Sequence, residues 1–252
     1  MNKKERLAPE IRAILESARE RENPDKRIEV VARPLAAALE KSRKRGHIPV
    51  IAEIKPTSPT TKNVRVEDPV DMAISMVENG AVALSVLTEP DHFHGSIESL
   101  ERVRDAVNVP ILRKDFILDE KQLDAVESDV VLIIASFVDD VKGLVSSAKQ
   151  RGFQVLVEVH SEEEIEIAVQ AEAEIIGINN RNIKNLNVNL DTFAELAPKV
   201  PSGIILIAES GIKNEEDARM MHKSGADGLL IGTAIMEGNI EQNTKRFTQI
   251  KI

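Results

Sequence analysis

Short, strongly apolar runs recur along this chain, and several of them end in a charged or polar side chain. Apolar runs of this kind, separated by helical patterns, are typical of parallel strands that are buried on both faces. A charge at the downstream end of such a strand is costly inside a core unless it points into a site. The side chains in question are Glu53, Lys55, Lys114, Glu158, Asn179 and Glu209. We therefore expect several strand ends to converge on one active site.

The apolar runs predict eight strands, at residues 50–55, 83–88, 111–114, 130–134, 154–159, 175–179, 204–209 and 228–231. Helical patterns lie between them, and one begins with Ser161 and Glu164 at the spacing of a capping box. Repeated strand–helix units of this number predict an α/β fold, a (β/α)8 TIM barrel whose strand ends share one mouth. A doubly wound sheet is the rival fold, but the G-x-G-x-x-G turn that often marks it is absent.

Residues 1–48 precede the first predicted strand and have helical patterns of their own. The spacing of apolar residues predicts one helix at about 9–21 and a second at about 33–44. We see no linker or low-complexity tract after this segment. We therefore expect a single domain over 1–252, in which an N-terminal helical extension, 1–48, packs on a barrel formed by 49–252.

Composition narrows the class of protein further. A net charge of −9 argues against nucleic-acid binding, because there is no basic field to displace counterions from phosphates. The chain has no Cys, which excludes disulfides, thiolate catalysis and Cys-ligated metal. No apolar signal core or membrane-spanning segment is visible, so we expect a cytoplasmic protein with no membrane partner. We expect a monomer or a weak homo-oligomer that acts on a small molecule.

Glycines after the last two predicted strands indicate a phosphate site. Glu209-Ser210-Gly211 follows the seventh strand, and Gly232-Thr233 follows the eighth. Backbone N–H groups beside such glycines can approach an anion closely, and barrels often hold a substrate phosphate in these two loops. The pattern indicates a phosphorylated ligand, although it does not specify the reaction.

Motifs along the whole predicted barrel resemble those of the indole-3-glycerol phosphate synthases. The matching segments are Ile51-Ala-Glu53-Ile-Lys55-Pro-Thr-Ser58-Pro, Leu87-Thr-Glu89, Phe93-His-Gly95-Ser, Pro110-Ile-Leu-Arg-Lys114-Asp-Phe116-Ile, Leu156-Val-Glu158-Val-His160, Gly177-Ile-Asn179-Asn-Arg181-Asn, Ala208-Glu-Ser210-Gly211-Ile and Leu230-Ile-Gly232-Thr233-Ala. Their order and spacing are compatible with the family throughout. The chain departs from the family pattern in the first loop, at Pro56-Thr57 and Thr60-Thr61-Lys62.

The resemblance implies a carbon–carbon lyase of tryptophan biosynthesis. Its reaction is the ring closure, decarboxylation and dehydration of 1-(2-carboxyphenylamino)-1-deoxyribulose 5-phosphate, which requires no cofactor and no metal. It implies that Lys114 is a general acid, that Glu158 is its acid/base and electrostatic partner, and that Glu53 is a base late in the sequence. It implies that Lys55 contacts the substrate carboxylate or acts as an acid. Asn179 and Ser210 complete the implied catalytic set.

The resemblance also implies a set of binding residues. Those implied to contact the substrate are Ser58, Phe93, Phe116, Leu132, Arg181, Leu186 and Glu209, and those implied to cradle its phosphate are Gly211, Gly232 and Thr233. Two other readings stay open at this point. One is a related phosphate-binding barrel such as phosphoribosylanthranilate isomerase, whose usual acid/base pair includes a Cys that this chain lacks. The other is a barrel that binds a phosphorylated ligand without catalysis.

Overall fold

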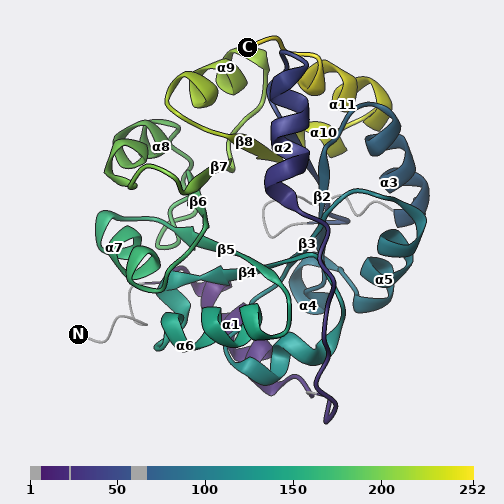
Figure 1. Ribbon diagram of the computed structural model, residues 1–252. Helices are drawn as coiled ribbons and strands as arrows, with labels where there is room; N and C mark the ends of the chain where they lie inside the picture. The colour runs from purple at the N-terminus through teal and green to yellow at the C-terminus, as the bar shows by residue number, and fades with distance from the viewer. Residues whose placement is uncertain (1–6, 23, 58–66) are drawn as a thin grey trace.

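The computed structural model describes residues 7–22, 24–57 and 67–252, and its centre is a closed barrel of eight parallel strands (Figure 1). The strands are β1 (Val50–Ile54), β2 (Ala83–Leu87), β3 (Ile111–Lys114), β4 (Val130–Ile134), β5 (Gln154–Val159), β6 (Ile175–Asn179), β7 (Ile205–Glu209) and β8 (Gly228–Ile231). Each strand pairs with the next along the chain, and β1 pairs with β8 to close the barrel. The predicted (β/α)8 fold is confirmed, and the predicted strand limits differ from these by one residue at one end of β1, β2 and β7.

Helices surround the barrel. Those within the described residues are α1 (Pro9–Glu20), α2 (Leu35–Lys44), α3 (Pro69–Glu78), α4 (Pro90–Phe93), α5 (Ile97–Ala106), α6 (Val141–Gln150), α7 (Glu162–Gln170), α8 (Asp191–Leu196), α9 (Glu215–Lys223), α10 (Thr233–Met236) and α11 (Ile240–Thr248). Short 3-10 helices lie at η2 (Glu120–Ala125), η3 (Ala135–Phe137) and η4 (Ala197–Lys199). Side-chain caps help to define where several of them begin, as where Ser96 accepts from the backbone N of Ser99 at the start of α5.

Two apolar layers hold this arrangement together. Side chains that point outward from the strands pack against the surrounding helices, and side chains that point inward fill the barrel. Leu35 and Leu39 of α2 are buried with the inward set, so α2 covers the end of the barrel at which the strands begin. Figure 1 is seen from this side, with α2 crossing in front of the strands.

The first helix, α1, lies at the opposite end of the barrel. Its buried residues are Ile14, Leu15 and Ala18. The backbone N of Ala8 donates to the carbonyl of Ile183 beyond β6, which ties the start of α1 to that side of the mouth. The amide of Gln122 in η2 donates to the carbonyl of Ala18 at 2.6 Å, which ties the end of α1 to the side of β3. The helix therefore lies across the mouth of the barrel.

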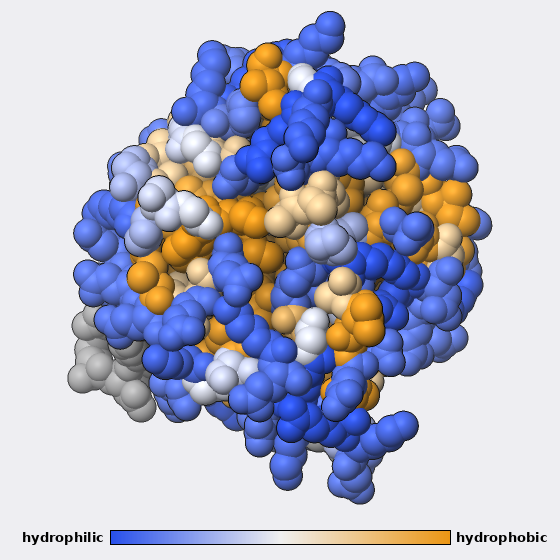
Figure 2. All heavy atoms as spheres, viewed as in Figure 1, coloured by the Kyte–Doolittle hydropathy of each residue, from blue (hydrophilic) through white to orange (hydrophobic). Residues whose placement is uncertain are grey.

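Hydrophilic side chains cover most of the face seen in Figure 2, with apolar groups visible between them. This agrees with a chain in which 30% of residues are charged. Among the described residues, no helix has the length and apolar character needed to span a bilayer.

Candidate active site

A cavity of about 940 Å³ opens at the carboxyl ends of the strands. Every strand contributes to its wall or floor, and α1 adds Ile11 and Ile14 at the rim. Strand register places Asn179 beside Glu209, and it places Glu158 beside Gly177, two residues before Asn179. The alternation of a parallel strand turns these side chains inward, toward the cavity.

Lys114 lies at the centre of the charged cluster. Its ammonium Nζ donates to Oε2 of Glu158 and to Oε2 of Glu209, both at 2.9 Å. The two carboxylates are almost completely buried, with side chains 4% and 1% exposed. Two buried acids therefore share one partly buried cation.

The surroundings of Lys114, Glu158 and Glu209 shift the pKa values of these three groups by different amounts and for different reasons. Burial disfavours the ammonium form of Lys114, but Glu158, Glu209 and Glu53 outweigh burial and raise its pKa. Burial also opposes ionisation of Glu158, but Lys114, His160 and Asn179 outweigh it and hold its pKa well below the usual range. For Glu209, burial and the neighbouring carboxylates prevail over Lys114 and raise the pKa to about 7. The cluster therefore holds a stable cation, a stable carboxylate and an acid that exchanges its proton near neutral pH.

A second ion pair stands beside this cluster. Lys55 Nζ lies 3.1 Å from Oε1 of Glu53 and 3.3 Å from the hydroxyl of Thr233. Gly232 makes room for the pair, because a Cβ at that position would lie 2.4 Å from Oε1 of Glu53. Lys55 thus joins the acidic end of β1 to the loop after β8.

The loop after β6 adds polar groups to the same wall. The amide of Asn179 donates to Oε1 of Glu158 at 2.8 Å, while its carbonyl oxygen accepts from the backbone N of Arg181. The Arg181 guanidinium donates to the carbonyl of Leu186 at 3.0 Å, and burial lowers its pKa. The loop therefore orients Asn179 toward Glu158.

One side of the cavity is aromatic. The Phe93 and Phe116 rings have centroids 6.3 Å apart, and the Phe116 and Phe137 rings have centroids 6.0 Å apart with planes 21° from parallel. Leu132 and Ile134 of β4 lie in the same wall. Ring pairs at these separations form a surface suited to an aromatic ligand.

The opposite side has the character of an anion site. Ser210, Gly211, Gly232 and Thr233 all line it. Ser210 has φ of 64°, a left-handed conformation that a non-glycine residue adopts only under constraint. Such backbone strain concentrates at ligand-binding sites, and here it lies where the sequence predicts a phosphate.

The structure brings the predicted site residues together. Those that line the cavity are Glu53, Lys55, Phe93, Lys114, Phe116, Leu132, Glu158, Asn179, Arg181, Leu186, Glu209, Ser210, Gly211, Gly232 and Thr233. Ser58, the remaining predicted contact, lies outside the described residues. No group of three His, Cys, Asp or Glu side chains suited to a metal ion occurs in the part of the chain that the structure describes.

Several residues of the site are missing from the sequence-based set. They are Ile11 and Ile14 of α1, Phe137, and the polar residues Lys213, Asn243 and Arg246 near the predicted phosphate loops. His160 also belongs here, since its Nε2 lies 3.3 Å from Oε1 of Glu158. Strand alternation, which puts residues 158 and 160 on one face, was the signal that could have identified it.

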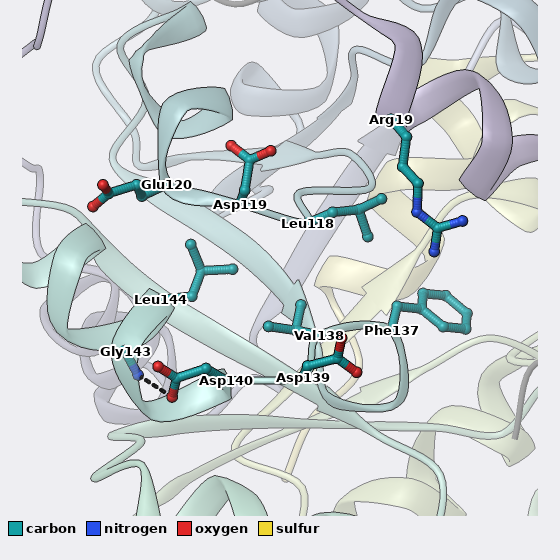
Figure 3. A pocket seen from close by; sticks show the side chains of 10 residues that line it. All are labelled: Arg19, Leu118, Asp119, Glu120, Phe137, Val138, Asp139, Asp140, Gly143 and Leu144. Atoms are coloured by element: carbon teal, nitrogen blue, oxygen red, sulfur yellow. Dashed lines mark hydrogen bonds between the residues drawn. The ribbon is translucent and has the colours of Figure 1, made fainter.

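A second, smaller cavity of about 410 Å³ shares Phe137 with the first. Figure 3 shows the side chains that line it. Arg19 of α1 and four carboxylates line this cavity. Two of the four have structural roles, because Asp119 caps η2 and Asp140 caps α6 through Gly143 N. We assign it no chemistry.

The statistical model of a family described as "Indole-3-glycerol phosphate synthase" matches residues 4–247. Relatives with the same description include a protein of Haloarcula marismortui, 52% identical over 99% of this chain and 95% of its own. Another is a Halobacterium salinarum protein, 53% identical over 95% of this chain and 96% of its own. A Methanocaldococcus jannaschii protein is 42% identical over 84% of this chain and 82% of its own.

Solved structures with lower identity share the fold. The N-acetylmannosamine-6-phosphate 2-epimerase of Clostridium perfringens aligns with a TM-score of 0.60 at 18% identity, over 79% of this chain and 92% of its own. Thiamine phosphate pyrophosphorylase of Pyrococcus furiosus aligns with a TM-score of 0.59 at 17% identity, over 79% of this chain and 93% of its own. At such identities the likeness concerns the barrel alone.

Proposed function

This chain belongs to the indole-3-glycerol phosphate synthase family, and we propose that the family's reaction takes place in the cavity at the mouth of its barrel. That reaction converts 1-(2-carboxyphenylamino)-1-deoxyribulose 5-phosphate into indole-3-glycerol phosphate, carbon dioxide and water, in tryptophan biosynthesis. The substrate has a phosphate at one end, a polar chain in the middle and an aromatic ring at the other end. The cavity wall follows the same order, with Lys114 in the middle, and this match is the observation that supports the proposal most strongly.

Ring closure is the step assigned to Lys114. The aromatic carbon that bears the carboxylate attacks the ribulosyl ketone, so a carbon–carbon bond forms and negative charge develops on the ketone oxygen. An ammonium group has three N–H donors, and two of them go to Glu158 and Glu209. The third is available to stabilise the developing alkoxide and to deliver its proton.

Decarboxylation follows from the product of ring closure. Closure disrupts the aromatic ring and leaves an iminium, which accepts the electron pair when the bond to the carboxylate breaks. Neither a metal nor a cofactor is needed as electron sink. The part assigned to the protein is to hold the carboxylate, and Lys55 is the cation for it.

Dehydration needs one group to remove a proton and another to protonate the leaving hydroxyl. Glu53 is assigned as the base and Glu158 as the acid/base partner of Lys114. Glu209 and Asn179 bind the substrate hydroxyls, and Arg181 lies in the same wall. Carboxylates and ammonium groups this close titrate together, so the apparent pKa values describe the whole cluster and not single residues.

Direct assay of the purified protein tests the proposal. With the carboxyphenylamino substrate and no added metal or cofactor, we expect release of carbon dioxide and formation of indole-3-glycerol phosphate. Lys114→Ala should lower kcat about 1,000-fold, because the ketone loses its proton donor. Lys149→Ala is the matched control, since that ammonium pairs with Glu174 on the outside of the barrel. An unchanged rate in Lys114→Ala would remove the assigned role.

The same assay separates the two rival readings. Turnover of phosphoribosylanthranilate instead of the carboxyphenylamino substrate would favour an isomerase. Tight binding of indole-3-glycerol phosphate without any turnover would favour a binding protein. Within the described part of the site, no feature favours either of these over the synthase reaction.

The proposal also includes a cytoplasmic location and a low oligomeric state. A biosynthetic enzyme of this family is expected to work in the cytoplasm on a free small-molecule substrate. We propose a monomer or a weak homo-oligomer, because all eight strand ends that form the cavity come from one chain. Light scattering coupled to gel filtration measures the molar mass that decides this.

A further inference from the structure

His160 has a buried side chain that takes no part in the proposed reaction steps. It follows β5 directly, and its side chain is 8% exposed. Its Nδ1 lies 3.2 Å from Oε2 of Glu164 and its Nε2 lies 3.3 Å from Oε1 of Glu158. A carboxylate therefore lies beside each ring nitrogen, and these two negative charges favour the doubly protonated imidazolium.

Glu164 holds this ring from the first turn of α7. The expected capping box is only half formed, because the Ser161 hydroxyl accepts from Glu164 N while the Glu164 carboxylate turns toward His160. There Oε2 accepts from the backbone N of His160 at 2.7 Å as well as facing the ring. Backbone and ring of His160 are thus held by one carboxylate oxygen.

The other end of the imidazolium faces a carboxylate of the active site. Oε1 of Glu158 faces His160 and accepts from Asn179, while Oε2 of Glu158 accepts from Lys114. The Nε2–H direction misses hydrogen-bond geometry, so its attraction to Glu158 is that of opposite charges at short range. Glu209 has no comparable second partner, and its Oε1 has no hydrogen bond within the described residues.

We propose that His160 is a positioning residue that decides which of the two carboxylates around Lys114 carries a proton. As an imidazolium held by Glu164, it keeps Glu158 ionised and turned toward Lys114, and it leaves Glu209 as the group that gains and loses a proton. The inference rests on the proposed role of Glu158 as acid/base partner of Lys114. Pairs of acids separated in this way divide the roles of acid and base at one pH.

The charges that act on the ring are few. Glu158 faces it from its own strand and Glu164 faces it from α7, while Lys114 of β3 and Asn179 of β6 reach it through Glu158. Burial disfavours the imidazolium, but the two carboxylates outweigh burial and raise the pKa of His160 to about 9. The ring is therefore charged over the neutral range.

The test is the pH dependence of kcat and kcat/KM in His160→Gln. Glutamine still fills the site and donates a hydrogen bond, but it has no charge. We expect kcat to fall about tenfold, KM to change less than about twofold, and the acid limb of the profile to move up by about one pH unit. A profile that superimposes on that of the unmodified enzyme, or a rise in KM at constant kcat, would overturn the inference.

Glu164→Gln provides a second variant that keeps the imidazole. Removing one anionic neighbour lowers the pKa of the ring, so the alkaline limb should move to lower pH. Nitrogen-15 NMR of the five His rings follows the titration directly and does not depend on activity. A His160 ring that titrates at the same pH in this variant and in the unmodified enzyme would contradict the proposed interaction of Glu164 with the ring.

Two controls make the outcome specific. His222→Gln removes an imidazole of α9 that contacts the carbonyl of Ala226 away from the cavity, and its profile should not change. Glu158→Gln tests whether Glu158 is the acid/base partner of Lys114, on which the inference depends. If it retains full turnover, the proposed catalytic role fails, whereas an inactive Glu158→Gln beside a normal His160→Gln rejects the positioning role alone.

Discussion

A glycine of β6, Gly177, decides where the carboxylate of Glu209 lies. A Cβ built at Gly177 would lie 2.1 Å from Oε1 of Glu209 and 2.7 Å from a methyl group of Leu156. Because Gly177 has no side chain, the Glu209 side chain can extend past β6 toward Lys114. Gly177 is therefore needed for the geometry of the site, although it has no functional group.

Gly177→Ala should displace the Glu209 carboxylate and break its 2.9 Å bond to Lys114. A shift of about 1 Å in such a group costs on the order of 100-fold in rate, so kcat/KM should fall by about that factor. Steady-state kinetics with the authentic substrate measures the loss.

Gly143→Ala is the control for simple overpacking. A Cβ there would lie 2.2 Å from a carboxylate oxygen of Asp140, which caps α6 outside the active-site cavity. The buried Gly177→Ala should lose about 1–3 kcal/mol of stability, and the exposed Gly143→Ala should lose less because it meets only the end of the Asp140 side chain. Only Gly177→Ala should lose activity. Equal activity in the two variants would show that Gly177 is merely a packing position.

At the level of elements, one arginine ties α1 to the aromatic wall. Arg21, just after the helix, donates to Asp115 at 2.5 Å and to Glu89 at 3.3 Å. Glu89 caps the short helix α4 that holds Phe93, and Asp115 lies between Lys114 and Phe116 in sequence. Burial opposes ionisation of Asp115, but Arg113 and Arg21 outweigh it and lower its pKa to about 2. Arg21 therefore connects three parts of the predicted ring pocket.

Arg21→Met should weaken substrate binding more than it slows the chemistry. Methionine keeps the apolar stem, but Asp115 and Glu89 lose a cation, which costs about 1–3 kcal/mol for a buried charged hydrogen bond. We expect KM to rise about tenfold, because Phe93 and α1 would be held less firmly around the substrate. We expect kcat to change little. Initial rates over a range of substrate concentrations separate the two constants.

Arg19→Met on the same helix supplies the comparison. Arg19 is exposed and lines only the smaller cavity. Its removal should leave KM and stability near those of the unmodified enzyme. A tenfold rise in KM in both variants would mean that general helix charge, rather than the contacts of Arg21, is responsible.

For the whole molecule, two buried groups make the free energy of unfolding depend on pH. The folded state raises the pKa of His160 from 6.5 to about 9 and that of Glu209 from 4.5 to about 7. In both cases the folded state binds more protons than the unfolded state, so stability falls as pH rises. The contribution of His160 is fully present below about pH 6.5 and is lost by about pH 9.

Urea unfolding at pH 6.5 and pH 9 should therefore show a lower free energy of unfolding at the higher pH. The share due to His160 is at most about 3 kcal/mol. His160→Gln should reduce the difference between the two pH values, and His222→Gln should leave it unchanged. A pH dependence that is identical in all three proteins would contradict the buried imidazolium.

Local patterns predicted much of the site because they depend on few neighbouring residues. Alternation predicted that Glu53 of β1 and Lys55 just after it face the same side, and their ion pair lies in the cavity. The spacing of apolar residues also predicted the helix α1. An apolar face shows that a helix packs against the protein, but it does not show where. Which end of the barrel α1 covers depends on distant contacts, such as that of Arg21 with Asp115.

The sequence by itself determined the barrel and the identity of its polar rim. Strand and helix periodicities act over a few residues, and chain order then orders the strands around the closed sheet. Only the tertiary structure decided that Lys114 forms a hydrogen bond with Glu209, 95 residues away in the sequence, and that His160 lies against Glu158. These pairings set the proton affinities of the cluster. They arise from closure and burial, which bring unlike charges out of water and into contact.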